Sequence, residues 1–172
     1  MGQGDSLSAA PHFGFDDMDG SSRNGLGSPA QVCAQCGVHC CRLGGAVATR
    51  EEVLAVRAAG YKDDFERVAA DVYVTRWTHD GTCPYLIETT CSIYDMRPLR
   101  CRAFPVFQTG SGEVFLAKCP LEQALSSKDV RATRDLLLQC PDDVVRDAAE
   151  HLKPHASTLE KRMKRYGVER IS

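Results

Sequence analysis

The cysteines are the residues of this chain whose number and spacing could do chemistry. Thiolates are the soft ligands of zinc and of iron–sulfur clusters, and both commonly take four at each site. Eight of the nine cysteines lie within fewer than ninety residues: Cys33, Cys36, Cys40, Cys41, Cys83, Cys91, Cys101 and Cys119. This density predicts a metal centre, and some of the thiols could instead be redox-active.

The adjacent pair Cys40 and Cys41 bears on the kind of centre. Neighbouring side chains on an extended backbone point to opposite faces, so both sulfurs would reach one ion only with strain. The adjacency therefore favours two neighbouring metal centres, or one polynuclear cluster, over a single zinc finger. Zinc and iron are both compatible with it.

Basic residues flank several of these cysteines: Arg42, Arg100, Arg102 and Lys118. A four-thiolate site carries about −2 net charge with its metal, so these side chains could offset that charge and donate hydrogen bonds to sulfur. Arg97 and Arg102 could alternatively hold a carboxylate or phosphate of a substrate, or brace their loop against backbone carbonyls.

The cysteines and their neighbours together form a specific pattern. Cys-x-x-Cys-x-x-x-Cys-Cys at 33–41 is followed by Cys-Pro-Tyr-Leu at 83–86, by Cys-Ser-Ile-Tyr-Asp-Met-Arg-Pro-Leu-Arg-Cys-Arg-Ala-Phe-Pro at 91–105, and by Cys-Pro at 119–120. This combination resembles the YkgJ cysteine-cluster family, which is described as zinc- or iron-chelating and often as iron–sulfur proteins. The resemblance covers about half of the chain and implies that the eight clustered cysteines are the metal ligands.

Four further residues near the cysteines or outside the cluster could have local roles. His39 could replace a cysteine ligand, although eight thiolates make it unnecessary. Cys140, outside the cluster, is expected to pack as a small apolar residue, with a free reactive thiol as the alternative. Tyr94 could donate a hydrogen bond or belong to the core, and Asp95 could cap the turn at Pro98.

Local signals predict a small α+β domain, organised by metal, with short strands and a C-terminal group of helices. Thr49 and Glu52 form a capping box, and Gly60 ends the helix that they begin. The other predicted elements are a short helix at 62–70, a strand at 72–77, extended pieces at 83–87 and 91–94, a short helix after Pro98, a hairpin over 105–116, and helices at 128–139, 142–152 and up to about 166.

The predicted organisation has three parts: a disordered arm at 1–31, a metal-binding domain at 32–120 and a helical extension at 121–172 packed on it. Lys161, Arg162, Lys164 and Arg165 are expected to form a solvated helix face, and a contact with RNA is the alternative. His79 is expected in a turn, and His151 and His155 are expected at the surface.

Composition limits the location and the partners. The net charge of −2 does not indicate a nucleic-acid or membrane-surface binder, and no apolar run could span a bilayer. Without a secretory signal the chain is expected in the cytoplasm, where clustered cysteines serve metals more often than disulfides. The first six residues match the spacing for N-myristoylation at Gly2, with an unmodified disordered leader as the alternative.

The expected function is therefore binding of an iron–sulfur cluster, or else of Zn2+, with a redox or metal-assisted role on an unknown protein or small-molecule substrate. The alternative is a structural zinc module without catalysis, which uses its terminal helices to contact a partner. A disulfide-stapled domain would need an oxidising compartment.

Overall fold

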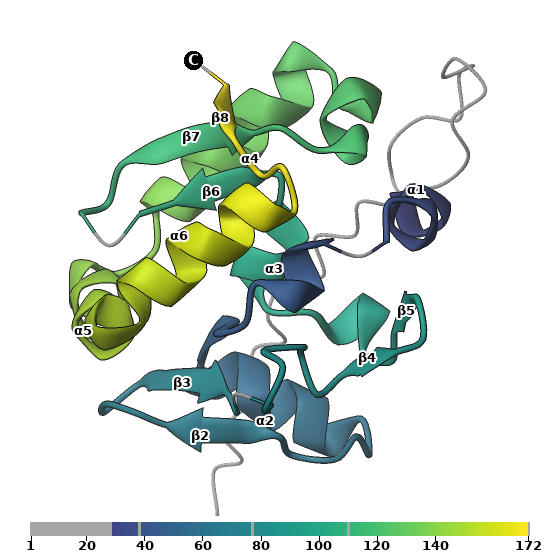
Figure 1. The fold of residues 1–172 in the computed structure, drawn as a ribbon. Coiled ribbons are helices and arrows are strands. Elements are labelled where there is room, and N and C mark those ends of the chain that lie inside the picture. Colours follow the sequence, from purple (N-terminus) through teal and green to yellow (C-terminus); the bar gives the residue numbers. More distant parts are fainter. Residues whose placement is uncertain (1–28, 38, 77, 110, 172) are drawn as a thin grey trace, which may run out of the picture.

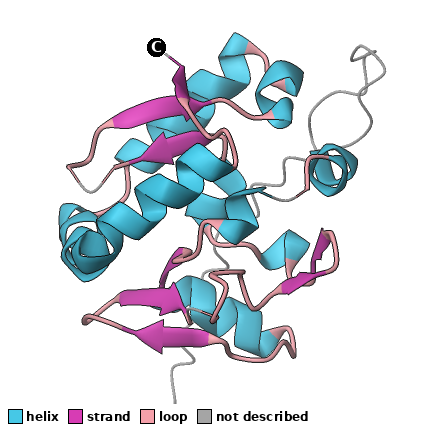
Figure 2. Ribbon diagram, in the orientation of Figure 1, coloured by secondary structure: helices cyan, strands magenta, loops and turns pink. Residues whose placement is uncertain are grey.

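The computed structural model describes residues 29–37, 39–76, 78–109 and 111–171 (Figure 1). In chain order the elements are α1 (Pro29–Gln35), η2 (His39–Arg42), β1 (Val47–Thr49), α2 (Arg50–Ala58), β2 (Phe65–Arg67), β3 (Val72–Thr75), β4 (Leu86–Ile87), β5 (Thr90–Cys91), η3 (Tyr94–Met96), α3 (Leu99–Ala103), β6 (Val106–Gln108), β7 (Val114–Ala117), η4 (Pro120–Ala124), α4 (Ser127–Leu138), α5 (Asp142–Leu152), η5 (Lys153–His155), α6 (Ala156–Arg165) and β8 (Arg170–Ile171), where η marks a 3-10 helix. Helices and short antiparallel strands mix throughout, which confirms the α+β class (Figure 2).

Residues 1–28 of the predicted arm, including the motif at Gly2, lie outside the described residues. The arm and the predicted division into three parts therefore stay predictions.

The first sheet has the antiparallel order β1–β3–β2 and carries a helix on each face. Alternate residues of a strand point to opposite faces, so the sheet takes part in two separate cores. One core joins it to α5 through Val47, Val72, Val74, Val144 and Ala148. The other joins it to α2 through Ala48, Val53, Val56 and Phe65.

The predicted short helix at 62–70 is wrong, because residues 65–67 form the edge strand β2 of this sheet. Phe65 lies opposite Thr75 of β3, and its side chain is buried beneath α2. The hydrogen bonds that hold β2 come from a strand further along the chain, and three residues are too few to display an alternating pattern. The predicted strand at 72–77 is confirmed over its first four residues as β3, and Trp77 lies outside the described residues.

The second sheet has the order β6–β7–β8 and packs against α4. The predicted hairpin over 105–116 is confirmed as β6 and β7, and the three predicted C-terminal helices are confirmed as α4, α5 and α6. The last strand, β8, adds to β7 with Leu116 opposite Ile171, which brings the end of the chain back to the sheet (Figure 1).

Helix α3 joins the two halves, because it contacts β1 on one side and both β6 and α4 on the other. Its start is held by Glu52 of α2. One carboxylate oxygen of Glu52 accepts the Thr49 N–H in the capping box, as predicted, and the other accepts the Leu99 N–H at 2.6 Å. The expected cap by Asp95 is not formed, since Asp95 is exposed and α3, which begins after Pro98, has no side-chain cap.

Candidate metal centre

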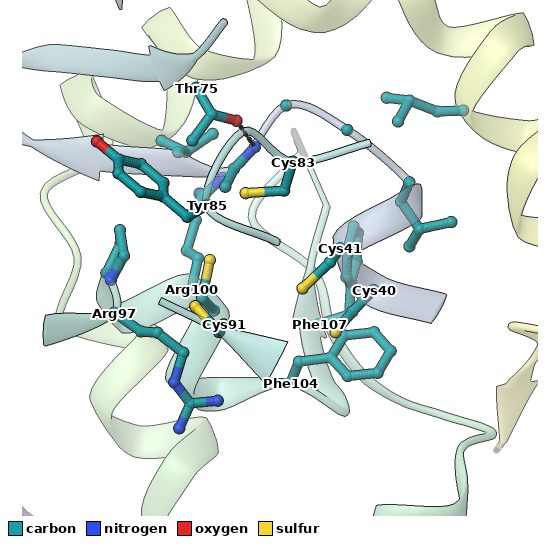
Figure 3. Close-up of a pocket in the computed structure, with 18 of the residues that line it drawn as sticks. Cys40, Cys41, Thr75, Cys83, Tyr85, Cys91, Arg97, Arg100, Phe104 and Phe107 are labelled. Atoms are coloured by element: carbon teal, nitrogen blue, oxygen red, sulfur yellow. Dashed lines mark hydrogen bonds between the residues drawn. The ribbon is translucent and has the colours of Figure 1, made fainter. Parts of the chain in front are cut away.

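Six of the eight clustered cysteines line one cavity of about 670 Å3 between the two halves of the fold (Figure 3). They come from three segments of the chain and are Cys33, Cys40, Cys41, Cys83, Cys91 and Cys101. Cys36 and Cys119 are not part of its wall. All nine cysteines are free thiols of intermediate exposure.

The first cysteine segment is helical. Cys33 lies in α1, and Cys40 and Cys41 lie together in η2. The assumption of extended backbone at this pair is therefore wrong: successive side chains of a 3-10 helix are about 120° apart, because it has three residues per turn. Both thiols line the cavity, so their adjacency does not by itself exclude a shared ion.

The second segment is the β4–β5 hairpin, which carries Cys83 before it and Cys91 in its second strand. The Cys83 N–H donates to the Cys41 carbonyl at 2.7 Å, so this segment lies directly against η2. Tyr85 anchors the hairpin to the segment before β2: its hydroxyl donates to the Lys62 carbonyl at 2.8 Å and accepts the Asp64 N–H at 2.9 Å.

The third segment is α3, whose Cys101 faces the same cavity. As predicted, a short helix follows Pro98 and carries this cysteine. Because α3 also touches both sheets, it places Cys101 at the junction where the other cysteine segments meet.

Helix α6 holds two of these segments through Arg162. Its guanidinium donates to the Leu43 carbonyl at 3.0 Å, directly after η2. It also lies against buried Gly81, where an added Cβ would come within 2.1 Å of it. Arg162 is therefore half-buried at the cysteine loops, so the expectation that it forms part of a solvated face is wrong. Nothing in the sequence signals this contact, because 119 residues separate the two partners.

The thiols in the centre are held in their neutral form. Burial raises the pKa of Cys33 to about 12 and the pKa values of Cys83 and Cys119 to about 11. Burial also raises the pKa values of Cys91 and Cys101. A thiol with such a pKa carries its proton at neutral pH, and only a strong competitor such as a metal ion removes it.

Cys40 is the cysteine that is electrostatically coupled to most of the other clustered thiols. Its own pKa is raised well above the usual range, first by its hydrogen bond with Cys41 and then by burial. A thiolate at Cys40 would in turn raise the pKa values of five other thiols: Cys33, Cys83, Cys91, Cys101 and Cys119. The cysteines inside and outside the cavity wall thus form one electrostatically connected group.

Arg97 is the cation that acts on this group. Its positive charge lowers the thiol pKa of Cys33, Cys40, Cys91 and Cys101. Its Nε donates to the Tyr94 carbonyl at 2.8 Å, and the guanidinium lies 3.6 Å from the centre of the Tyr94 ring. Tyr94 thereby fixes the position of Arg97 in the cavity wall.

Of the four basic residues that flank cysteines in the sequence, Arg100 lines the cavity and the other three do not. Lys118 pairs with Glu169, and Arg42 donates to the Gly37 carbonyl. Arg102 is not part of the cavity wall, whereas Arg100 is. Sequence adjacency to a ligand therefore did not identify the cation that faces the thiols.

Histidine does not join the cysteines here. His39 stacks on Tyr166 at the end of α6, with ring centres 5.2 Å apart. Cys140 is partly buried against the core between β3 and α5, which agrees with its expected packing role. His79 is exposed, while His151 and His155 are half-buried and lie near each other, with ring centres 6.2 Å apart.

The donor atoms fit zinc or iron, although they are not in ligation geometry. Thiol sulfur is the donor that both structural zinc and iron–sulfur clusters use. Within the described ranges, no three His, Cys, Asp or Glu side chains stand close enough together to hold an ion. Binding therefore requires the converging sulfurs to rotate toward one another.

Comparison with known proteins defines the class. Residues 32–120, more than half of the chain, match the family model CxxCxxCC, described as "Putative zinc- or iron-chelating domain". The chain belongs to this family, which confirms the resemblance inferred from the cysteine pattern and makes it a metal-binding, cysteine-rich protein. No curated protein and no solved structure matches it. None of the described helices is long and apolar enough to cross a membrane.

Proposed function

We propose that the eight clustered cysteines bind an iron–sulfur cluster, and that the protein uses it in redox chemistry or metal-assisted modification of a substrate. The observation that carries this proposal is that six of the eight thiols open on one large cavity instead of closing around a point. A purely structural site is closed by its ligands, whereas a reactive one leaves room for a reactant.

The residues around the thiols suit a reactive centre. A bound iron–sulfur cluster would supply one-electron transfer. The Arg97 guanidinium would stabilise the negative charge of the thiolates, since it already lowers four of their pKa values. Phe104 and Phe107 lie on the cavity wall near Cys40 and keep water from that side (Figure 3). Exposed Thr89 and Thr90 of the hairpin lie where the cavity meets solvent.

The second candidate is a structural zinc site at the other end of the cysteine group. Cys36 and Cys119 lie outside the cavity wall, yet the negative charges of both raise the pKa of Cys33. Helix α1 packs on η4, so these thiols sit between two elements that a metal could clamp. Such a site would organise the fold without reacting, and it is compatible with a reactive centre beside it.

Metal identity separates the two candidates. The protein is purified without oxygen from iron-replete cells, and its absorption spectrum, iron, sulfide and zinc content are measured. The expected result is a brown protein with the broad absorption above about 400 nm that is typical of thiolate-bound clusters. Iron and sulfide should be present in stoichiometric amounts. A colourless protein with zinc alone would overturn the iron–sulfur proposal and support the structural one.

Metal loading is expected to release protons. At pH 7 the thiols of Cys33, Cys83 and Cys119 are protonated, because their pKa values are raised to about 11 or 12. Each thiol that coordinates must lose its proton, so apparent affinity should rise with pH by about tenfold per unit for each proton displaced. A weakly buffered titration of the metal-free protein with Zn2+ and a pH indicator measures this. Release of fewer than about three protons per chain would contradict a multi-thiolate site.

A further inference from the structure

The cavity extends beyond the cysteines, and this second part is apolar. Its volume of about 670 Å3 falls within the range of small-ligand sites, roughly 300–1,000 Å3. A wall of apolar side chains continues it toward α5 and α6: Phe107, Leu137, Leu152, Leu159 and Met163. These groups offer nothing to a metal but suit the apolar body of an organic molecule.

Arg100 lies in the wall of the same cavity, and its charge has no ion-pair partner among the described residues. Its Nη2 donates to the Gln108 side-chain oxygen at 2.9 Å, and the Gln108 amide in turn donates to the Leu137 carbonyl at 3.2 Å. Its Nε is buried and meets no acceptor. In the described part of the chain, no carboxylate lies within 4.0 Å of this guanidinium.

The nearest anionic groups do not satisfy Arg100. Both Glu52 oxygens already accept backbone N–H groups, from Thr49 and Leu99. A partly buried cation without a matching anion is unfavourable, and an anion that enters the cavity would relieve it.

The two arginines of the wall therefore differ in role. Arg97 acts on four cysteine thiols and is stacked on Tyr94, whereas the charge of Arg100 affects none of those four. Three further charged side chains line the cavity, Asp95, Lys153 and Glu160, and all three are exposed, so solvent screens their charges.

We propose that this cavity binds a small monocarboxylate with an apolar body, which places its carboxylate at Arg100 and its body along the α5–α6 wall beside the cysteines. A single guanidinium whose Nη2 is already held by Gln108 suits one carboxylate better than a phosphate dianion. That this molecule is the reactant of the centre rests on the proposed function, whereas its binding does not.

The test uses the full chain, metal-free and zinc-loaded, with three probes of equal length: octanoate, octanol and octyl phosphate. Calorimetry is expected to show that octanoate binds at least about tenfold more tightly than octanol, since a hydrogen bond to a charged group contributes that much. Arg100→Gln should remove this difference, while Arg134→Gln on the exposed side of α4 should keep it. Equal binding of octanoate and octanol by the natural chain would overturn the proposal, and tighter binding of octyl phosphate would overturn the carboxylate assignment.

A second variant keeps the test decisive if Arg100→Gln does not fold. Leu159→Trp fills the apolar wall from the partly exposed helix α6 and should weaken octanoate and octanol alike, by about tenfold or more. Unchanged binding would place the ligand elsewhere and refute the site. Octanoate binding to a chain that takes up no metal would refute the metal centre but not this site. A chain that takes up metal but does not bind octanoate would refute only this site.

Discussion

Replacement of Cys40 with serine is expected to lower metal affinity by more than about 100-fold, since loss of a supporting partner alone costs 10- to 100-fold. Cys40 is the one thiol whose charge acts on five others, inside the cavity wall and outside it. A serine hydroxyl is a harder and much weaker donor for zinc or iron than a thiolate. Bound metal per chain, measured by elemental analysis after desalting, should fall accordingly.

Cys140→Ser is the matched control for this substitution. Cys140 is also partly buried, but it packs against the core of β3 and α5 and does not contribute to the cavity wall. This variant should keep its full metal content, and circular dichroism of both variants separates loss of a ligand from loss of the fold. Full metal retention in a folded Cys40→Ser protein would remove Cys40 from the ligand set.

The parts of the fold that could be predicted are those with local signals. The Thr49–Glu52 capping box is contained in four residues, and β3 has β-branched and aromatic residues throughout. The hairpin β6–β7 and the C-terminal helices likewise carry their turn and proline signals within their own segments. The edge strand β2 could not be predicted, because its evidence is its pairing with β3.

In the candidate site, too, features with a local sequence signal could be predicted and features that depend on long-range contacts could not. That cysteines distant in the sequence come together was predictable, since cysteine type and spacing are visible in the sequence and match a family pattern over residues 32–120, and six of the eight line one cavity. How they converge was not predictable. The 3-10 turn at Cys40 depends on packing, and the cation facing the thiols is Arg97 because Tyr94 holds it there. Long-range contacts, such as that between Arg162 and Leu43, leave no local trace.

Gly81→Ala is expected to disturb the metal centre from outside the ligand set. Gly81 has φ +80°, where a side chain is strained, and its new Cβ would lie 2.1 Å from the Arg162 guanidinium. The backbone term alone costs about 1–3 kcal/mol of unfolding free energy. In addition Arg162 must move, so the Leu43 carbonyl loses its donor and the segments bearing Cys41 and Cys83 lose their common support. Metal affinity should fall by about tenfold or more, as for other supporting contacts of ligands.

Gly112→Ala separates the effect of backbone strain from the effect of displacing Arg162. Gly112 has nearly the same backbone conformation, φ +82°, and nothing within 4 Å of an added Cβ, so it reports the backbone strain alone. Its metal affinity should be that of the natural chain.

A double variant, Gly81→Ala with Arg162→Ala, tests whether the effect passes through Arg162, because once the guanidinium is gone the added methyl group has nothing to displace. The double variant should then bind metal no more weakly than Arg162→Ala. Additive losses of affinity would show instead that Gly81 supports the cysteines by a route other than Arg162.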